Sequence, residues 1–316
     1  MRSITRRRFL AQSATTAACA FLRPSGAIAG AAGSGPTLQF PSQPRERISV
    51  ASYPFREFIV DPERSSKAAD HTIELQDFAA HVFSRFKINK VELWTGHFPS
   101  TDPKYLSQLR TAVEAARAMI VNIAVDGEHS PYAADRGERE KAIAFSKQWA
   151  DVAAAVGSPS IRTNLPAAGD SEPSVERAAD SLLRVVEYTS AKNVIVNLEN
   201  DNPVSEDPFF LLKVIEKVKS PWLHALPDFA NTLATGKEEH AYSGVNAMFE
   251  SAYNICHVKE FEAAQDGKLV HVDMAKTFGF LNQHAYMGYC SMEFDSPGDP
   301  YQGTADLIEK TIRYLS

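Results

Sequence analysis

Cysteine is scarce in this sequence, and the spacing typical of thiol chemistry is missing. Only three cysteines occur among 316 residues, and no Cys-X-X-Cys pair is present. The ligands of a thiolate-type zinc site are therefore lacking. Cys256 and Cys290 lie in apolar, strand-like segments. An oxidising compartment would permit a disulfide between them, but we expect two buried thiols.

Long apolar runs and an excess of positive charge are missing as well. No apolar stretch reaches the roughly 18 residues that a membrane-spanning helix needs, so we expect no membrane span. The 33 Lys and Arg residues are outnumbered by 39 Asp and Glu residues, which gives a formal net charge of −6. This balance argues against nucleic acid or anionic lipid as a partner.

The N-terminus carries the three parts of an export signal in the expected order. Thr5–Leu10 matches the twin-arginine pattern, Phe9–Leu22 is modestly apolar, and Ala27–Ala29 offers a small-residue cleavage site. The alternative is a disordered basic tail. We predict a signal peptide over residues 1–29, recognition by the twin-arginine export machinery, and a periplasmic or secreted mature protein. Loss of the five arginines in this segment would move the net charge from −6 to −11.

The rest of the chain is interpreted as a short connection followed by one domain. Residues 30–46 are rich in Gly, Ala, Ser and Pro and are expected to form a linker or extended arm. Residues 47–316 alternate between strand-like and helical segments. The eight strand candidates are Ile48–Phe55, Lys90–Trp94, Ile120–Val125, Ser160–Leu165, Val194–Leu198, Leu223–Pro227, Ile255–Val258 and Cys290–Phe294.

Helical segments with one apolar face separate these strands. In one of them Ala178, Leu182, Val185 and Val186 recur at helical spacing. Eightfold strand–helix alternation is typical of either a (β/α)₈ barrel or a doubly wound sheet. No Gly-X-Gly-X-X-Gly follows the first strand, and polar residues gather at the carboxyl ends of the strands, so we predict an α/β fold of the TIM-barrel type. The longer connection between residues 257 and 293 is expected to form a lid or a short helix over the mouth.

Four acidic or imidazole side chains stand at the ends of the last four predicted strands. They are Glu199, Asp228, His257 and Glu293, separated by 29, 29 and 36 residues. Each spacing is about one strand plus one helix, so all four side chains should meet at the barrel mouth. Three carboxylates and one imidazole suit one divalent metal ion, with Mn²⁺ favoured and Mg²⁺ or Co²⁺ as alternatives. The alternative interpretation is four unrelated helix caps or surface charges.

With these motifs the chain resembles the sugar phosphate isomerase/epimerase family, the xylose isomerase-like barrels that include ketose 3-epimerases. The resemblance covers roughly residues 47–316 and implies that the quartet binds the metal. It also implies that Glu199 and Glu293 move protons on opposite faces of a bound ketose. The motifs that carry the resemblance are VELW at 91–94, NLEN at 197–200, Pro227–Asp228, His-X-Lys at 257–259 and SMEF at 291–294.

The chain departs from the ketose 3-epimerase pattern at two positions. Asn231 stands where that pattern has a His three residues after the ligand Asp. Ala263 stands where it has an Arg six residues after the ligand His. Both family residues help to hold the sugar, so the resemblance supports the metal site better than it supports that substrate.

Other polar or aromatic residues near the strand ends are candidates for binding substrate. A tryptophan there could stack on a sugar face or simply pack in the barrel, and an arginine could bind substrate oxygens or pair with Glu92. Lys259 could polarise a carbonyl or form a salt bridge with a neighbouring carboxylate. The candidates are Trp94, His97, Arg162, Asn164, Asn200, Asn231 and Lys259.

These residues predict metal-assisted removal of a proton next to a carbonyl, through an enediolate. The first hypothesis is an isomerase or epimerase of an unphosphorylated sugar or keto-sugar, working as a monomer or homo-oligomer. A metal-dependent lyase that cleaves 3-keto-glycosides by β-elimination is the alternative with the same machinery. A phosphodiesterase of the endonuclease IV type would need more histidine ligands than can be placed at the strand ends, and the net charge argues against it. A non-catalytic sugar-binding barrel is the remaining alternative.

Overall fold

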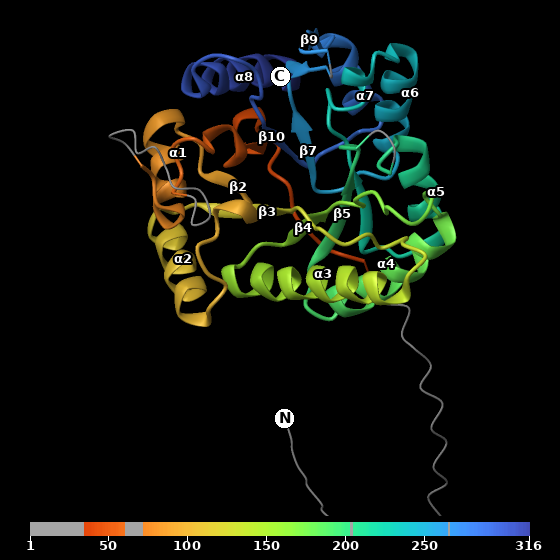
Figure 1. Ribbon diagram of the computed structural model, residues 1–316. Helices are drawn as coiled ribbons and strands as arrows, with labels where there is room; N and C mark the ends of the chain where they lie inside the picture. The colour runs from red at the N-terminus through yellow and green to blue at the C-terminus, as the bar shows by residue number, and fades with distance from the viewer. Residues whose placement is uncertain (1–34, 61–71, 203–204, 265) are drawn as a thin grey trace, which may run out of the picture. The chain divides into compact units, whose positions relative to one another are not determined.

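A barrel of parallel strands forms the centre of the protein (Figure 1). This computed structural model describes residues 35–60, 72–202, 205–264 and 266–316. The predicted signal peptide therefore lies outside the described residues. The barrel strands are β1 (Ile48–Ala51), β2 (Lys90–Trp94), β3 (Met119–Val125), β4 (Ser160–Thr163), β5 (Ile195–Glu199), β6 (Leu223–Leu226), β7 (Ile255–Val258) and β10 (Tyr289–Met292).

The strand order confirms the predicted TIM barrel. The eight strands are hydrogen-bonded in the order β6-β5-β4-β3-β2-β1-β10-β7, and all neighbours run parallel. The two end strands approach each other through isolated parallel bridges, one of which joins Asp228 to His257. This bridge nearly closes the barrel and sets two of the four proposed metal ligands side by side.

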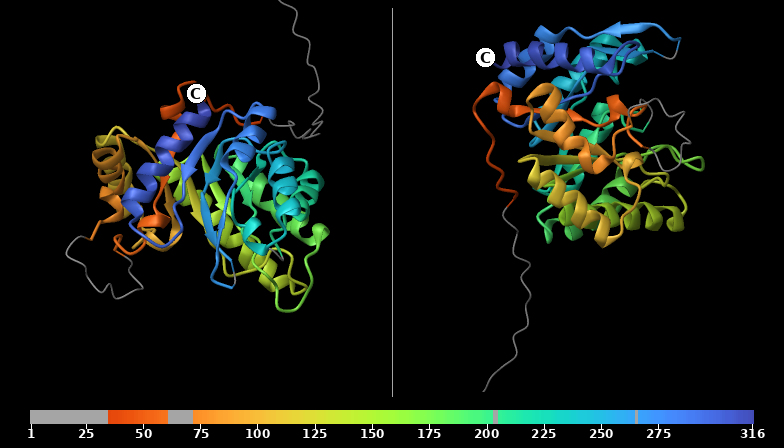
Figure 2. Two further views of the ribbon diagram at one scale, coloured as in Figure 1. Left: turned by 90° about the horizontal axis from the view of Figure 1, so that it is seen from above. Right: turned by 90° about the vertical axis from the view of Figure 1, so that its left-hand side faces the viewer.

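Helices surround the strands (Figure 2) and cover their outer faces. In α4 the apolar stripe is buried, and Ser174 caps the helix by accepting a hydrogen bond from the backbone N–H of Arg177. Gly157 ends α3 in the left-handed region at φ 81°. The helices are α1 (Phe78–Phe86), α2 (Pro103–Ala115), α3 (Arg136–Val156), α4 (Val175–Ser190), α5 (Pro208–Val218), α6 (Glu238–Met248), α7 (Met274–Gln283) and α8 (Pro300–Leu315).

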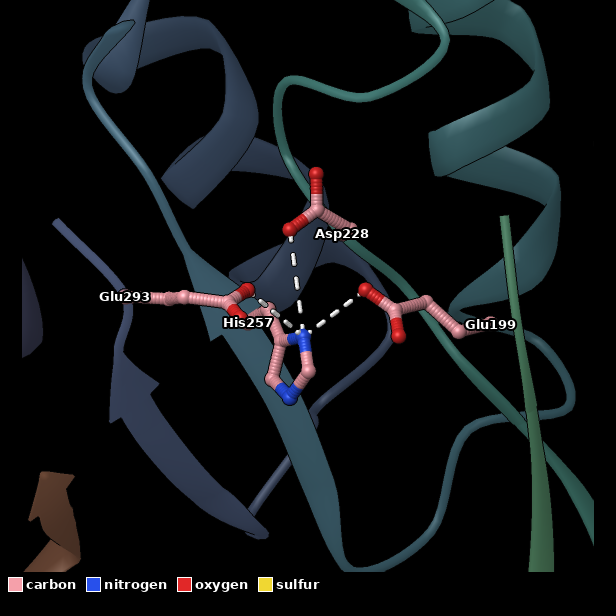
Figure 3. Close-up of side chains that lie close together, drawn as sticks. All are labelled: Glu199, Asp228, His257 and Glu293. Carbon is pink, nitrogen blue, oxygen red and sulfur yellow. Dashed lines mark hydrogen bonds and ion pairs between the residues drawn. The ribbon is translucent and has the colours of Figure 1, made fainter. Parts of the chain in front are cut away.

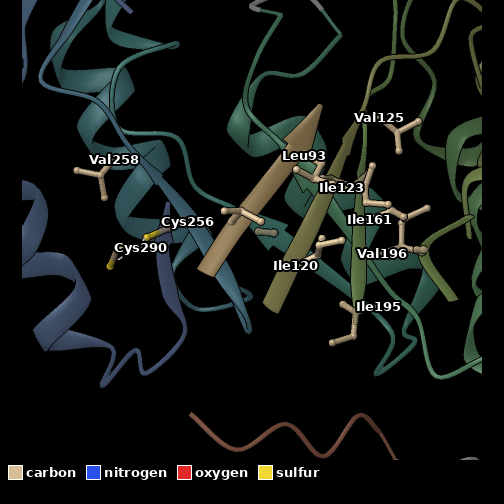
Figure 4. Close-up of a cluster of buried hydrophobic side chains, with 14 of the residues drawn as sticks. Leu93, Ile120, Ile123, Val125, Ile161, Ile195, Val196, Cys256, Val258 and Cys290 are labelled. Atoms are coloured by element: carbon tan, nitrogen blue, oxygen red, sulfur yellow. Dashed lines mark hydrogen bonds between the residues drawn. The ribbon is translucent and has the colours of Figure 1, made fainter. Parts of the chain in front are cut away.

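The strands themselves are short and almost wholly buried, as expected for a parallel sheet covered on both faces. Their Val, Ile and Leu side chains form a continuous core with the helices (Figure 4). The thiols of Cys256 and Cys290 lie in this core, 3.8 Å apart on neighbouring strands, and both cysteines are free. The expectation of two buried thiols is thus confirmed.

Two predicted elements differ from the structure. The first strand ends at Ala51 rather than Phe55, because Ser52 turns into the helical region and Tyr53–Phe55 forms a 3-10 turn that contains Pro54. The long connection after His257 forms no single lid. It contains a hairpin of β8 (Phe261–Ala263) and β9 (Leu269–His271), and then α7, which packs between α6 and α8 in the outer ring.

The described part of the predicted linker, Gly35 to Glu46, packs against the amino-terminal end of the barrel. Phe40 makes edge-to-face contacts with Tyr253 and Tyr289 at ring-centroid distances of 5.5 and 5.7 Å. The Tyr253 hydroxyl donates to the carbonyl of Pro36 and accepts from the N–H of Leu38. This arm closes the end opposite the predicted site. Across the described ranges, no helix combines the length and the apolar character that crossing a membrane requires.

Candidate metal centre

The four predicted metal ligands meet at one point. Glu199 is the last residue of β5, Asp228 lies two residues beyond β6, His257 belongs to β7, and Glu293 follows β10 directly. One ligand atom from each lies within 4.8 Å of those from the others (Figure 3). All four residues are buried, with exposures of 0 to 7%. The strand-end pattern in the sequence therefore predicted a real cluster.

The imidazole faces the three carboxylates through a single nitrogen. Nδ1 of His257 lies 2.8 Å from Oε1 of Glu199, 3.0 Å from Oε2 of Glu293 and 3.9 Å from Oδ2 of Asp228. Oδ1 of Asp228 is held by the backbone N–H groups of Ala230 and Asn231, which leaves Oδ2 to face the centre.

The carboxylate oxygens have the properties expected of metal ligands. Oε2 of Glu199, Oδ2 of Asp228 and Oε2 of Glu293 are buried and accept no hydrogen bond from the described residues. Burying such oxygens is costly unless a cation compensates them. Three carboxylate oxygens and one imidazole nitrogen form a donor set suited to a divalent ion. The residues present thus fit the predicted metal.

Glu92 holds the opposite side of the imidazole. Both carboxylate oxygens of Glu92 lie 3.0 Å from Nε2 of His257, and they also accept hydrogen bonds from Ser291 (2.6 Å) and Asn122 (2.7 Å). An irregularity in the β2–β3 pairing after Val91 sets Glu92 opposite Asn122. Glu92 therefore favours a proton on Nε2, an arrangement in which Nδ1 would be the nitrogen that binds a metal. Pairing of Glu92 with Arg162 was one of two alternatives from the sequence, and Arg162 instead pairs with Asp126 and Glu199.

Charge complementarity shifts the pKa values of these groups. Burial lowers the pKa of His257, but Glu199 and Glu92 outweigh it, so the pKa lies well above its usual value. Burial raises the pKa of Glu92, yet His257 brings it below the ordinary range. Burial also raises the pKa of Asp228, to about 7, although Lys259 opposes the change.

Two cations complete the electrostatics of the site. Nε of Arg162 lies 2.8 Å from Oε2 of Glu199, as an ion pair without hydrogen-bond geometry, and Nη1 bonds to Asp126. Nζ of Lys259 lies 3.4 Å from Glu293 and 3.6 Å from Asp228. Burial raises the pKa of Glu293, but Lys259 and then His257 hold it well below its usual range.

The remaining predicted substrate-binding residues divide into two groups. Trp94 and Asn231 line the cavity above the four ligands, as do Arg162 and Lys259. Trp94 donates to Asp126 at 2.6 Å. Asn231 donates to Glu199 at 3.2 Å and accepts from Lys259 at 2.8 Å.

Asn200, His97 and Asn164 lie outside the lining of this cavity. Asn200 is buried, and its side-chain amide accepts from the backbone N–H of Asp228 at 2.7 Å and donates to the Asp228 carbonyl at 3.0 Å. Asn200 therefore holds the backbone of the proposed ligand Asp228 in place. His97 is buried behind Trp94, and its Nδ1 lies 3.0 Å from the Ser52 hydroxyl. Asn164 accepts a hydrogen bond from the backbone of Gly127 at 2.8 Å.

Sequence reasoning missed several acidic groups of the cavity, which has a volume of about 240 Å³. Asp126 directly follows β3, so the strand-end rule that selected Glu199 could have selected it. Asp295 lies two residues after Glu293 and pairs with Arg56 at 2.9 Å. The full lining is Ala51, Ser52, Tyr53, Glu92, Trp94, Ala124, Asp126, Arg162, Glu199, Asp201, Asn231, Lys259, Glu262, Glu293 and Asp295.

Comparison with known proteins identifies the family. Residues 83–315 match the model of the xylose isomerase-like TIM barrel family. The chain belongs to this family. A search of curated protein sequences found no significant match. The family assignment rests on most of the chain and agrees with the resemblance drawn from the metal-ligand motifs.

Several solved structures are similar in fold at low sequence identity. D-allulose 3-epimerase from Methylomonas sp. has a TM-score of 0.64 and 15% identity, with 88% of this chain and 100% of that chain covered. 3-Keto-D-glucoside 4-epimerase from E. coli has a TM-score of 0.59 and 13% identity (84% and 98% covered). A xylose isomerase-like barrel from Mycobacterium smegmatis, solved with magnesium, has a TM-score of 0.62 and 13% identity (85% and 96% covered).

Proposed function

We propose that this protein is a divalent-metal-dependent isomerase or epimerase of an unphosphorylated sugar or keto-sugar. The observation that carries the proposal is the buried convergence of Glu199, Asp228, His257 and Glu293 on one point beneath a polar cavity. Mn²⁺ is the favoured metal, with Mg²⁺ or Co²⁺ as alternatives. The similarity to sugar epimerases of the same fold gives general support to this reaction class.

The chemistry starts from a proton on the carbon next to a carbonyl. Glu199, Asp228, His257 and Glu293 would hold a divalent ion, which would supply positive charge to stabilise the substrate oxygens as this proton leaves. Glu199 and Glu293 approach the centre from opposite sides (Figure 3), so one carboxylate can take the proton and the other can return it. Arg162 is the ion-pair partner of Glu199, and the charge of Lys259 helps to hold the pKa of Glu293 well below its usual range.

The charge of the cavity disfavours a phosphorylated substrate. Its lining carries seven carboxylates against Arg162 and Lys259, both of which already pair with acidic side chains. A phosphate group would add negative charge to this wall. An uncharged sugar would instead donate its hydroxyls to the carboxylates, which accept hydrogen bonds strongly.

A test of the proposal is solvent deuterium incorporation into a panel of ketoses and 3-keto-glycosides, with Mn²⁺ and with a chelator. We expect metal-dependent exchange that Glu293→Gln abolishes. Glu206→Gln is the matched control, because Glu206 is equally buried but contacts backbone N–H groups instead of the metal ligands. Turnover of sugar phosphates alone would contradict the proposed substrate class, and metal-independent sugar binding without exchange would favour a non-catalytic barrel.

β-Elimination from a 3-keto-glycoside is a second candidate, and the position of Lys259 favours it. Its buried ammonium group lies beside Glu293, where it could protonate a departing oxygen after Glu293 takes the carbon proton. Release of the aglycone without formation of an epimer would select this reaction.

Export by the twin-arginine machinery is a further part of the proposal. Arg6 and Arg7 form the pair on which that pathway depends. A change of both to Lys should leave the precursor in the cytoplasm, whereas unchanged fractionation would contradict export by this route.

A further inference from the structure

A second and larger cavity adjoins the one above the metal ligands. Its volume is about 570 Å³, more than twice the 240 Å³ of the inner cavity. Asp201, Asn231 and Glu262 line both, so the two cavities adjoin each other. The inner volume is below the roughly 300–1,000 Å³ of most ligand pockets. It therefore suits a single sugar ring, and any group attached to that ring would extend into the outer cavity.

Small side chains make room in the outer cavity. Ala234 and Gly236 come from the turn after β6, and Ala263 and Ala264 come from the β8–β9 hairpin. Gly236 has φ 78°, where a larger residue would be strained. Asn231 and Ala263, the two positions at which the sequence departs from the ketose 3-epimerase pattern, both lie in this lining.

The charges of the outer cavity indicate what kind of group it accepts. Three carboxylates, from Asp201, Glu262 and Asp266, face one cation, Lys237. An anionic group would be repelled there. None of the lining residues that the structure describes is aromatic, so an aromatic group would find no aromatic stacking partner among them. Carboxylates and the Asn231 amide suit hydroxyl donors, as a second sugar unit provides.

We propose that the substrate is an uncharged glycoside with at least two sugar units. The ring that carries the carbonyl occupies the inner cavity beside Glu293, and the second sugar occupies the outer cavity between Asn231 and Ala263. This inference rests on the proposed function and narrows its substrate class.

Calorimetric titration of the Mn²⁺-loaded full-length protein tests the size preference without turnover. The probes are maltose and cellobiose, with methyl α- and β-glucoside as their one-ring counterparts. We expect at least one disaccharide to bind tenfold more tightly than its methyl glucoside. Ala263→Trp should fill the outer cavity and remove this advantage. Ala275→Trp is the control, because Ala275 is an equally exposed alanine on α7 that lines a different surface pocket.

The outcomes separate this inference from the proposed function. Equal affinity for one-ring and two-ring probes, no binding of any probe, or an unchanged advantage in Ala263→Trp would overturn the inference. Deuterium exchange into the corresponding 3-keto sugars is then measured in the same variants. A disaccharide preference without exchange would refute the proposed function alone. Exchange into a methyl 3-keto-glucoside as fast as into the keto-disaccharides, unaffected by Ala263→Trp, would refute the inference alone.

Discussion

Replacement of Glu92 by Gln should weaken metal binding although Glu92 is not a proposed ligand. The Glu92 carboxylate accepts hydrogen bonds from three donors, those of His257, Ser291 and Asn122. Glutamine has one oxygen and one NH₂ group, so at least one of these donors would face another donor. If the NH₂ group faces His257, Nε2 must become an acceptor and the proton moves to Nδ1. That nitrogen is the one that faces the other three ligands.

The expected loss of metal affinity follows from the position of Glu92, which contacts the proposed ligand His257 on the side away from the metal site. Loss of such a supporting carboxylate typically lowers metal affinity by about 10- to 100-fold, which corresponds to ~1.4–2.8 kcal/mol of binding free energy. We therefore expect the Kd for Mn²⁺ to rise by that factor in Glu92→Gln, with the rest of the site in place. Isothermal titration of the metal-free protein with Mn²⁺ measures this directly.

Glu206→Gln provides the control for this experiment. Glu206 is as deeply buried as Glu92, and among the described residues it accepts hydrogen bonds from the backbone N–H groups of Leu165 and Asn202. Its replacement should leave the Kd for Mn²⁺ within about twofold. Equal affinity in wild type and Glu92→Gln would refute the reasoning, and so would an equal loss in both variants.

Three further predictions concern stability and reactivity. Burial, and next the charge of Asp201, raise the pKa of Glu206 to about 8, so the folded protein binds this proton more tightly than the unfolded chain. Stability from this group is complete below about pH 4.5 and is lost as the pH rises through about 8. Between these pH values Glu206 should contribute a slope of up to ~1.4 kcal/mol per pH unit to the unfolding free energy. Urea denaturation at several pH values should show that this contribution is absent in Glu206→Gln. Phe40→Ala should cost ~1–3 kcal/mol of unfolding free energy without changing the Kd for Mn²⁺, and an unchanged denaturation midpoint would contradict the packing of the arm. Cys256 and Cys290 should react with a thiol reagent only after unfolding, because both are fully buried.

The metal centre could be predicted because its ligands are tied to the strand ends. Each βα unit delivers one residue to the same end of the barrel, so the spacings from Glu199 to Glu293 carry three-dimensional information. The helix faces were predictable for a similar reason, since apolar residues recur with the period of the helix, as Leu182 and Val186 do in α4.

The partners inside the barrel could not be predicted in this way. Glu92 meets His257 across 165 residues, and the irregular pairing of β2 with β3 that sets Glu92 opposite Asn122 has no signal in the sequence. Likewise, Arg162 forms ion pairs with Glu199 and Asp126 and not with Glu92. The register of the strands determines these partners, and the register cannot be read from the sequence. The β8–β9 hairpin has strands of three residues each, too short to show an alternating pattern.

The most direct test of the central claim is a crystal structure of the protein soaked with Mn²⁺, with anomalous scattering measured at the manganese edge. We predict one strong peak in the barrel, bound by one carboxylate each from Glu199, Asp228 and Glu293 and by Nδ1 of His257. Nε2 should remain bonded to Glu92. No peak at this position, or a metal bound elsewhere in the barrel mouth, would contradict the account.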